Sequence, residues 1–138
     1  MKFFNPKDIA RPGSKYSHGA LVSTIGTRLI AAGQVGVAPD GTLEQGFEAQ
    51  SRRAWSNLFA VLAGAGMNKT NLIKVTVFVT QPDVTAAYRA IRDEVMEGHM
   101  PPMTYIVCAG LAAPGMLVEI EGEAMQEPQR VRGQGSER

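Results

Sequence analysis

Apolar residues in the first half of the chain first form short strand-like runs and then recur at helical spacing, and this change predicts strands followed by a helix. The stretches GALVSTIG and RLIAAGQVGV are short and rich in aliphatic and β-branched residues. Because only Gly26-Thr27 separates them, we predict a hairpin, with a further short strand near residues 2–5. From Phe47 onward apolar residues recur at helical spacing until Gly64 and Gly66, which predicts an amphipathic helix.

The middle of the chain predicts one more strand and one more helix. NLIKVTVFVT alternates strictly and predicts a strand. The side chains on its core side are expected to be Ile73, Val75, Val77 and Val79. A second helix is predicted from about Val84 to Met96, where GHMPP ends it. Its inner face is expected to contain Ala87, Tyr88, Ile91 and Val95.

Two final strands, centred on residues 105–109 and 117–124, complete the order β-β-α-β-α-β-β. This order predicts an α+β fold with one mostly antiparallel sheet and two helices on one face. The strand from Met103 carries apolar groups on both sides, so the face that the helices leave uncovered needs another cover, and self-association is the simplest one. We expect a single domain over residues 1–125 and a flexible tail over 126–138, because the tail lacks apolar periodicity.

Composition narrows the range of partners. Among 138 residues, 14 Lys and Arg balance 13 Asp and Glu without forming a basic patch, so no nucleic-acid partner is expected. The chain shows neither an apolar run of membrane-spanning length nor a signal peptide, which predicts a cytoplasmic protein without a membrane partner. A single cysteine and scattered histidines offer no ligand cluster, so neither a metal nor another cofactor is expected.

The clearest candidate for chemistry is Glu119, in the segment LVEIEGEA. Glu119, Glu121 and Glu123 share one side of the predicted strand, and a solvated outer face explains the last two. Glu119 lies deepest in the apolar part, where a carboxylate needs hydrogen-bond partners, and so placed it can orient a water molecule. Cys108, within an apolar strand, is instead interpreted as core packing.

Several segments together resemble the RidA/YjgF family. They are YSHGA, AAGQVG, DGTLEQGFEAQSRRAWSNLFAVLAGAGM, LIKVTVFVT, and PPMT followed by LVEIEGEA, in this order from about Ile9 to Ala124. The resemblance implies a chorismate-mutase-like α+β domain that forms a homotrimer with its sites between subunits. It also implies hydrolysis of reactive 2-imino or enamino acids to 2-oxo acids and ammonia, without metal or organic cofactor. An imine is already electrophilic, so positioning and one polarising contact can supply the rate.

The resemblance also implies roles for individual residues. By position, Tyr16 lines the substrate pocket, and the main chain at Gly33 and Ile106 hydrogen-bonds the substrate. Glu119 holds the attacking water. In the deaminating branch an arginine grips the substrate carboxylate, two residues after the proline that ends PP, and here that position is Thr104.

Thr104 is the departure that bears most on substrate choice. A guanidinium gives a bidentate, charge-assisted clamp of about 1.5 to 3 kcal/mol, whereas a hydroxyl gives a neutral bond nearer ~1 kcal/mol. Two further departures are Ala32, where the family usually has a hydroxyl residue, and a position near Tyr88, where it has an asparagine. Arg89 and Arg92 on the second helix are candidate substitute cations, with a solvated helix face as the alternative interpretation.

Two functions stay open on the sequence alone, with a third behind them. The first is an enzyme that hydrolyses an imine, enamine or related small molecule, and Glu119 with the intact GQ and VEIE segments favours it. The second is a homotrimer that binds a small-molecule ligand between subunits without turnover, and Thr104 favours it. A ribonuclease or translation-inhibitor role, sometimes attached to the family, ranks last because the chain has no basic patch.

Overall fold

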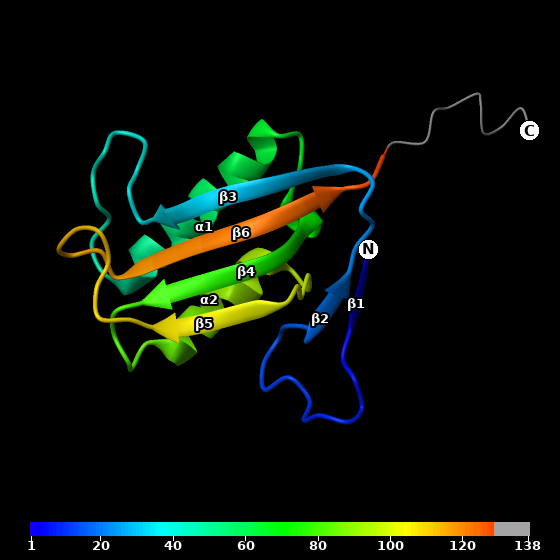
Figure 1. Cartoon of the computed structure of the whole chain (residues 1–138). Coiled ribbons are helices and arrows are strands. Elements are labelled where there is room, and N and C mark those ends of the chain that lie inside the picture. Colours follow the sequence, from blue (N-terminus) through cyan, green and yellow to red (C-terminus); the bar gives the residue numbers. More distant parts are fainter. Residues whose placement is uncertain (129–138) are drawn as a thin grey trace, which may run out of the picture.

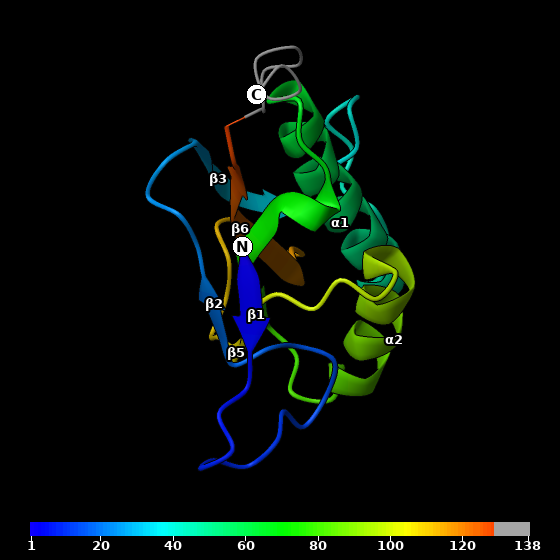
Figure 2. The ribbon, with the colours of Figure 1, turned by 90° about the vertical axis from the view of Figure 1, so that its right-hand side faces the viewer.

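A four-stranded sheet with both helices on one of its faces forms the body of the protein (Figures 1 and 2). The computed structural model describes residues 1–128, so most of the predicted tail lies outside the described residues. Across the sheet the strands are β3 (Thr27–Val35), β6 (Val118–Gln126), β4 (Leu72–Val79) and β5 (Met103–Val107). The helical elements are α1 (Phe47–Gly64), a 3-10 turn (Lys69–Asn71) and α2 (Thr85–Met96).

Strand pairing makes β3 and β5 the edges of this sheet. β6 is antiparallel to both of its neighbours, β3 and β4, whereas β4 and β5 are parallel because α2 carries the chain back between them. The α+β class, the mostly antiparallel sheet and the two helices on one face are therefore confirmed. In the described residues no helix is long and apolar enough to cross a membrane.

The core lies between the sheet and the helices. α1 buries one apolar stripe, and β4 and β6 supply the opposing layer. Its fully buried members include Ala54, Trp55, Leu58, Leu62, Val75, Val77, Val79, Val118 and Ile120. The prediction for β4 is thus confirmed at its three valines, but it is wrong at Ile73. A register shift between Leu72 and Lys74 turns Leu72 into the core instead.

The predicted hairpin between the first two apolar stretches is wrong. β2 (Gly19–Leu21) pairs with β1 (Lys2–Phe4) in a separate two-stranded sheet, and β3 pairs with β6. The short strand expected near residues 2–5 is present, and it takes the partner predicted for β3. Length explains the difference, since the nine residues of β3 form a longer ladder with the nine of β6 than with the three of β2.

The inner face of α2 is confirmed except at Ala87, and it extends to Arg92. Tyr88 and Ile91 are buried as expected and Val95 packs against the core, but Ala87 is exposed. Arg92 is buried as well, so a solvated position for this residue is excluded. Arg92 is buried because residues 5–18, between β1 and β2, lie against its side of α2 and help to enclose the guanidinium. We refer to residues 5–18 as the N-terminal segment.

The second face of the sheet is uncovered in the single chain. Figure 2 shows α1 and α2 on the same side of the sheet. On the other side, Ile30 of β3 is 64% exposed and Ile106 of β5 is 37% exposed, among charged side chains of β6 and β4. We refer to this side as the open face.

A buried glutamine ties α1 to the loop before β6. Gln50 is 2% exposed, and its Nε2 donates to the carbonyl oxygens of Glu44 at 3.1 Å and Gly115 at 2.9 Å. Its Oε1 accepts from the Leu117 N–H at 2.8 Å. Because Leu117 immediately precedes β6, these bonds set where β6 begins and so where Glu119 lies.

Gln50→Ala should lower the free energy of unfolding by about 1 to 3 kcal/mol, because partly buried hydrogen bonds to the main chain of Glu44, Gly115 and Leu117 are lost. Denaturant unfolding followed by circular dichroism measures the change. Ser56→Ala, at an exposed position of the same helix, is the control and should stay within about 0.5 kcal/mol. A loss for Gln50→Ala no larger than that of the control would contradict this role.

Candidate functional site

Glu119 lies on the open face, near the start of β6. In the ladder it stands opposite Phe78 of β4, and Phe78 stands opposite Ile106 of β5. On its other side Glu119 pairs with Val35 of β3. The residue is half-buried, and its side chain lies against Gly33. The residues Gly33, Ile106 and Glu119 therefore share one region of the open face.

A β-bulge at Ala32 and Gly33 makes room for this carboxylate. The register between β3 and β6 shifts between Ala31 and Gln34, so two residues of β3 stand against one of β6. A Cβ at Gly33 would lie 2.7 Å from Cδ and 2.8 Å from Cγ of Glu119, closer than carbon atoms pack. A Cβ at Gly33 would therefore force the Glu119 side chain to move, while Ala32 before it is exposed.

Thr104 is on the same face, two residues before Ile106, and its hydroxyl already has a partner. Lys74 of β4 donates from Nζ to Oγ1 of Thr104 at 2.6 Å. Glu123, which stands opposite Lys74 in the ladder, forms an ion pair with Arg28 instead. An ammonium group therefore lies beside position 104, although residue 104 itself is neutral.

Tyr16 and Tyr88 lie elsewhere, beside the helices. Both line a cavity of about 270 Å³ between the N-terminal segment, α2 and β5. Tyr88 is buried, and its ring packs against that of Tyr105 with centroids 5.0 Å apart. Burial raises the pKa of the Tyr88 phenol well above its ordinary value, so the hydroxyl stays protonated at neutral pH. The structure thus divides the predicted site residues between two places.

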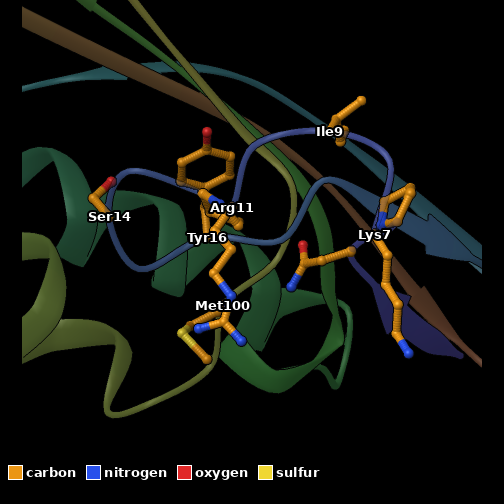
Figure 3. A pocket seen from close by; sticks show the side chains of 9 residues that line it. Lys7, Ile9, Arg11, Ser14, Tyr16 and Met100 are labelled. Atoms are coloured by element: carbon orange, nitrogen blue, oxygen red, sulfur yellow. The ribbon is translucent and has the colours of Figure 1, made fainter.

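A second, larger cavity adjoins the first along the N-terminal segment (Figure 3). Its volume is about 530 Å³, and Ser14 and Tyr16 line both cavities. The lining of the larger cavity contains two cations, Lys7 and Arg11, and no carboxylate. The N-terminal segment therefore contributes positive charge beside Tyr16.

Two contacts at these places were not found from the sequence. The alternation of β4 marks Lys74 as outward-facing, but only the parallel pairing of β4 with β5 brings it to Thr104. Likewise no spacing rule connects Ser14 with Arg92, which lie 78 positions apart and meet at 3.5 Å. Cys108 was interpreted as core packing, and this is wrong because it follows β5 and is only half-buried. Within residues 1–128, no three His, Cys, Asp or Glu side chains cluster to hold a metal ion.

The protein is a small α+β domain with two groups of candidate site residues. One group lies on the open face around Glu119, and the other lines the cavity between α2 and the edge strand β5. The chain belongs to the family described as endoribonuclease L-PSP, whose sequence pattern matches residues 8–126. This match and the names of its relatives confirm the resemblance to RidA/YjgF proteins.

Three comparisons illustrate the likeness. The RutC family protein YjgH of Escherichia coli K12 is 47% identical over 58 residues, which are 42% of this chain and 44% of that protein, so the match spans less than half the length of this curated relative. The 2-iminobutanoate/2-iminopropanoate deaminase of Rattus norvegicus is 30% identical over 115 residues, 82% of this chain and 81% of that protein. The crystal structure of YyfB from Yersinia pestis, a Rid family protein of unknown function, superposes with a TM-score of 0.81 at 30% identity, covering 91% of this chain and 98% of that one.

Gly33→Ala should lower the free energy of unfolding by about 1 to 3 kcal/mol, because the added methyl group overlaps the Glu119 side chain. In a Glu119→Ala background the same substitution should change it by less than about 0.5 kcal/mol, since the overlap is gone. Denaturant unfolding of the four proteins measures the coupling between the two positions. Equal losses in both backgrounds would show that the conflict is not with Glu119.

Proposed function

We propose that the protein hydrolyses a reactive imine or enamine metabolite and that Glu119 holds the attacking water. The observation that carries this proposal is the half-buried Glu119 carboxylate, which the bulge in β3 accommodates against Gly33. The rat relative is named a 2-iminobutanoate/2-iminopropanoate deaminase, and the similarity covers 82% of this chain. The position of the carboxylate and this similarity support the same chemistry.

The reaction needs only water, a positioned carboxylate and a bound substrate. The water oxygen bonds to the C=N carbon, one water proton passes to Glu119, and the π electrons move to nitrogen. Glu119 then returns the proton to nitrogen, which gives a carbinolamine, C(OH)–NH2. The hydroxyl proton passes to nitrogen, the C–N bond breaks, and the oxygen electrons form the C=O bond as ammonia leaves, so the overall change is addition of one water and release of one ammonia. Holding water and substrate together is the main contribution of the protein.

A second copy of the chain completes such a site. Tyr16 and Tyr88 lie on the helix side of β5, whereas Ile106 and Glu119 lie on the open face. One chain cannot place both pairs around one small substrate, because the sheet separates them. If the helix side of one copy meets the open face of the next, the contact is head-to-tail, and it forms a ring when the rotation between copies closes. We therefore propose a homotrimer with its ligand sites between subunits.

The alternative is a trimer that binds a small metabolite without turnover. Thr104 favours it, because its hydroxyl accepts from Lys74 and presents no guanidinium to a ligand. Both functions use the same surfaces, so turnover is the property that distinguishes them.

A coupled assay of ammonia release from freshly generated 2-iminobutanoate tests the catalytic proposal. We expect the wild type to accelerate release and Glu119→Gln to lower kcat by about 100-fold or more, because an amide does not accept the water proton. Glu121→Gln, an exposed neighbour on the same face, is the matched control and should keep the wild-type kcat. An unaffected Glu119→Gln would remove the water-holding role. An inert wild type whose Thr104→Arg variant gains activity would mean that the natural substrate is a different one.

Sedimentation of the full chain should show three chains per particle. Ile30→Glu should dissociate the particle, because it places an unpaired charge on the open face where we propose the subunits meet. Ile25→Glu is the matched control, since Ile25 is 68% exposed outside the four-stranded sheet. A monomeric wild type would eliminate the site between subunits.

A further inference from the structure

The charged side chains that line the cavity between the N-terminal segment and α2 are all positive. Two arginines, Arg89 and Arg92, line it, and no carboxylate is among its lining residues. Ser14 and Tyr16 enclose it from the N-terminal segment, and Tyr88 contributes from α2. A cavity of about 270 Å³ with this lining offers a small anion both positive charge and hydrogen-bond donors.

Arg92 is the group with unmet hydrogen-bonding capacity in this cavity. It is 4% exposed, and a buried guanidinium requires partners for its N–H groups. Oδ1 of Asp93 takes one edge, at 3.0 Å from both Nε and Nη2. On the other edge Nη1 reaches only the Ser14 hydroxyl, at 3.5 Å, and Nη2 makes no hydrogen bond of acceptable geometry. Among the described residues the Nη1/Nη2 edge therefore lacks a full set of hydrogen-bond partners, and protein atoms enclose Nη2.

We propose that Arg92 binds the carboxylate of a small organic acid in this cavity. The Nη1/Nη2 edge presents two parallel N–H groups, which match the two oxygens of a carboxylate. The Ser14 hydroxyl, beside Nη1, donates to the same group. The guanidinium also lies 5.8 Å from the centre of the Tyr88 ring, which helps to fix its orientation. The identity of the acid rests on the proposed function: it is the imino acid substrate or the oxo acid product.

This assignment accounts for a neutral residue at position 104. Thr104 and Lys74 are on the open face, whereas Arg92 is on the helix side of β5. In a ring of subunits the acid group is then held by one copy and the water by Glu119 of the next. Lys74 is the competing cation, but its ammonium already donates to Thr104 and lacks the planar pair of donors that a carboxylate prefers.

The adjoining cavity extends the positive charge along the N-terminal segment (Figure 3). Lys7 and Arg11 line it, and it shares Ser14 and Tyr16 with the Arg92 cavity. Charges of one sign along an approach raise the local concentration of ions of the opposite sign. The two cavities therefore favour an acidic ligand over a neutral one.

Calorimetric titration of the full chain with 2-oxobutanoate tests this assignment without requiring turnover. We expect saturable binding by the wild type and binding at least about tenfold weaker by Ser14→Asp, because the new carboxylate occupies the Nη1/Nη2 edge of Arg92. Ser14→Asp should keep or raise the melting temperature, so the lost affinity is not a lost fold. Arg92→Gln should also lose affinity. The matched control is Arg53→Gln, which removes a guanidinium paired with Glu44 and should bind as the wild type does.

Three results would overturn the assignment. The first is no binding by the wild type up to about 10 mM 2-oxobutanoate, and the second is wild-type affinity in Ser14→Asp. The third is a loss of affinity in Lys74→Met with Ser14→Asp unaffected, which places the acid group at position 104. The ammonia assay reports on turnover separately. An inert wild type whose 2-oxobutanoate binding is lost in Ser14→Asp would refute hydrolysis of 2-iminobutanoate and leave the Arg92 site standing.

Discussion

Coverage of the sheet on only one face is the constraint on which the rest of the structure depends. α1 and α2 supply the apolar side chains that bury β4 and β6 from one direction, and both lie on that side (Figure 2). The open face consequently mixes exposed apolar residues such as Ile30 with carboxylates such as Glu119. Such a face is too apolar to be a purely solvated surface and too charged to be a core, which suits a surface that meets another subunit and a small polar ligand.

The placement of Glu119 depends on contacts that are distant in sequence. Gln50 on α1 fixes the residue that precedes β6, and the bulge at Gly33 on β3 leaves space for the carboxylate. The Gln50 bonds fix the position of the strand β6, and the bulge gives the Glu119 side chain its space. Together they place the start of β6 and leave the Glu119 side chain beside Gly33 on the open face.

The N-terminal segment between β1 and β2 helps to enclose Arg92 of α2. The Ser17 hydroxyl attaches it to the loop after α2, because it donates to the Met100 carbonyl at 2.6 Å. Within the segment, the His18 N–H donates to Asn5 Oδ1 at 2.8 Å.

The sequence by itself determined the elements whose signal is local. The helical spacing of α1, the alternation of β4 and the outward parity of Glu119 follow from neighbouring residues, and the structure has them. The family followed from segments in a fixed order. Only the tertiary structure decided that β2 pairs with β1, that Lys74 meets Thr104, and that the N-terminal segment buries Arg92. Each of these joins residues far apart in the chain, and the choice among such contacts depends on strand length, register and packing, which no local period records.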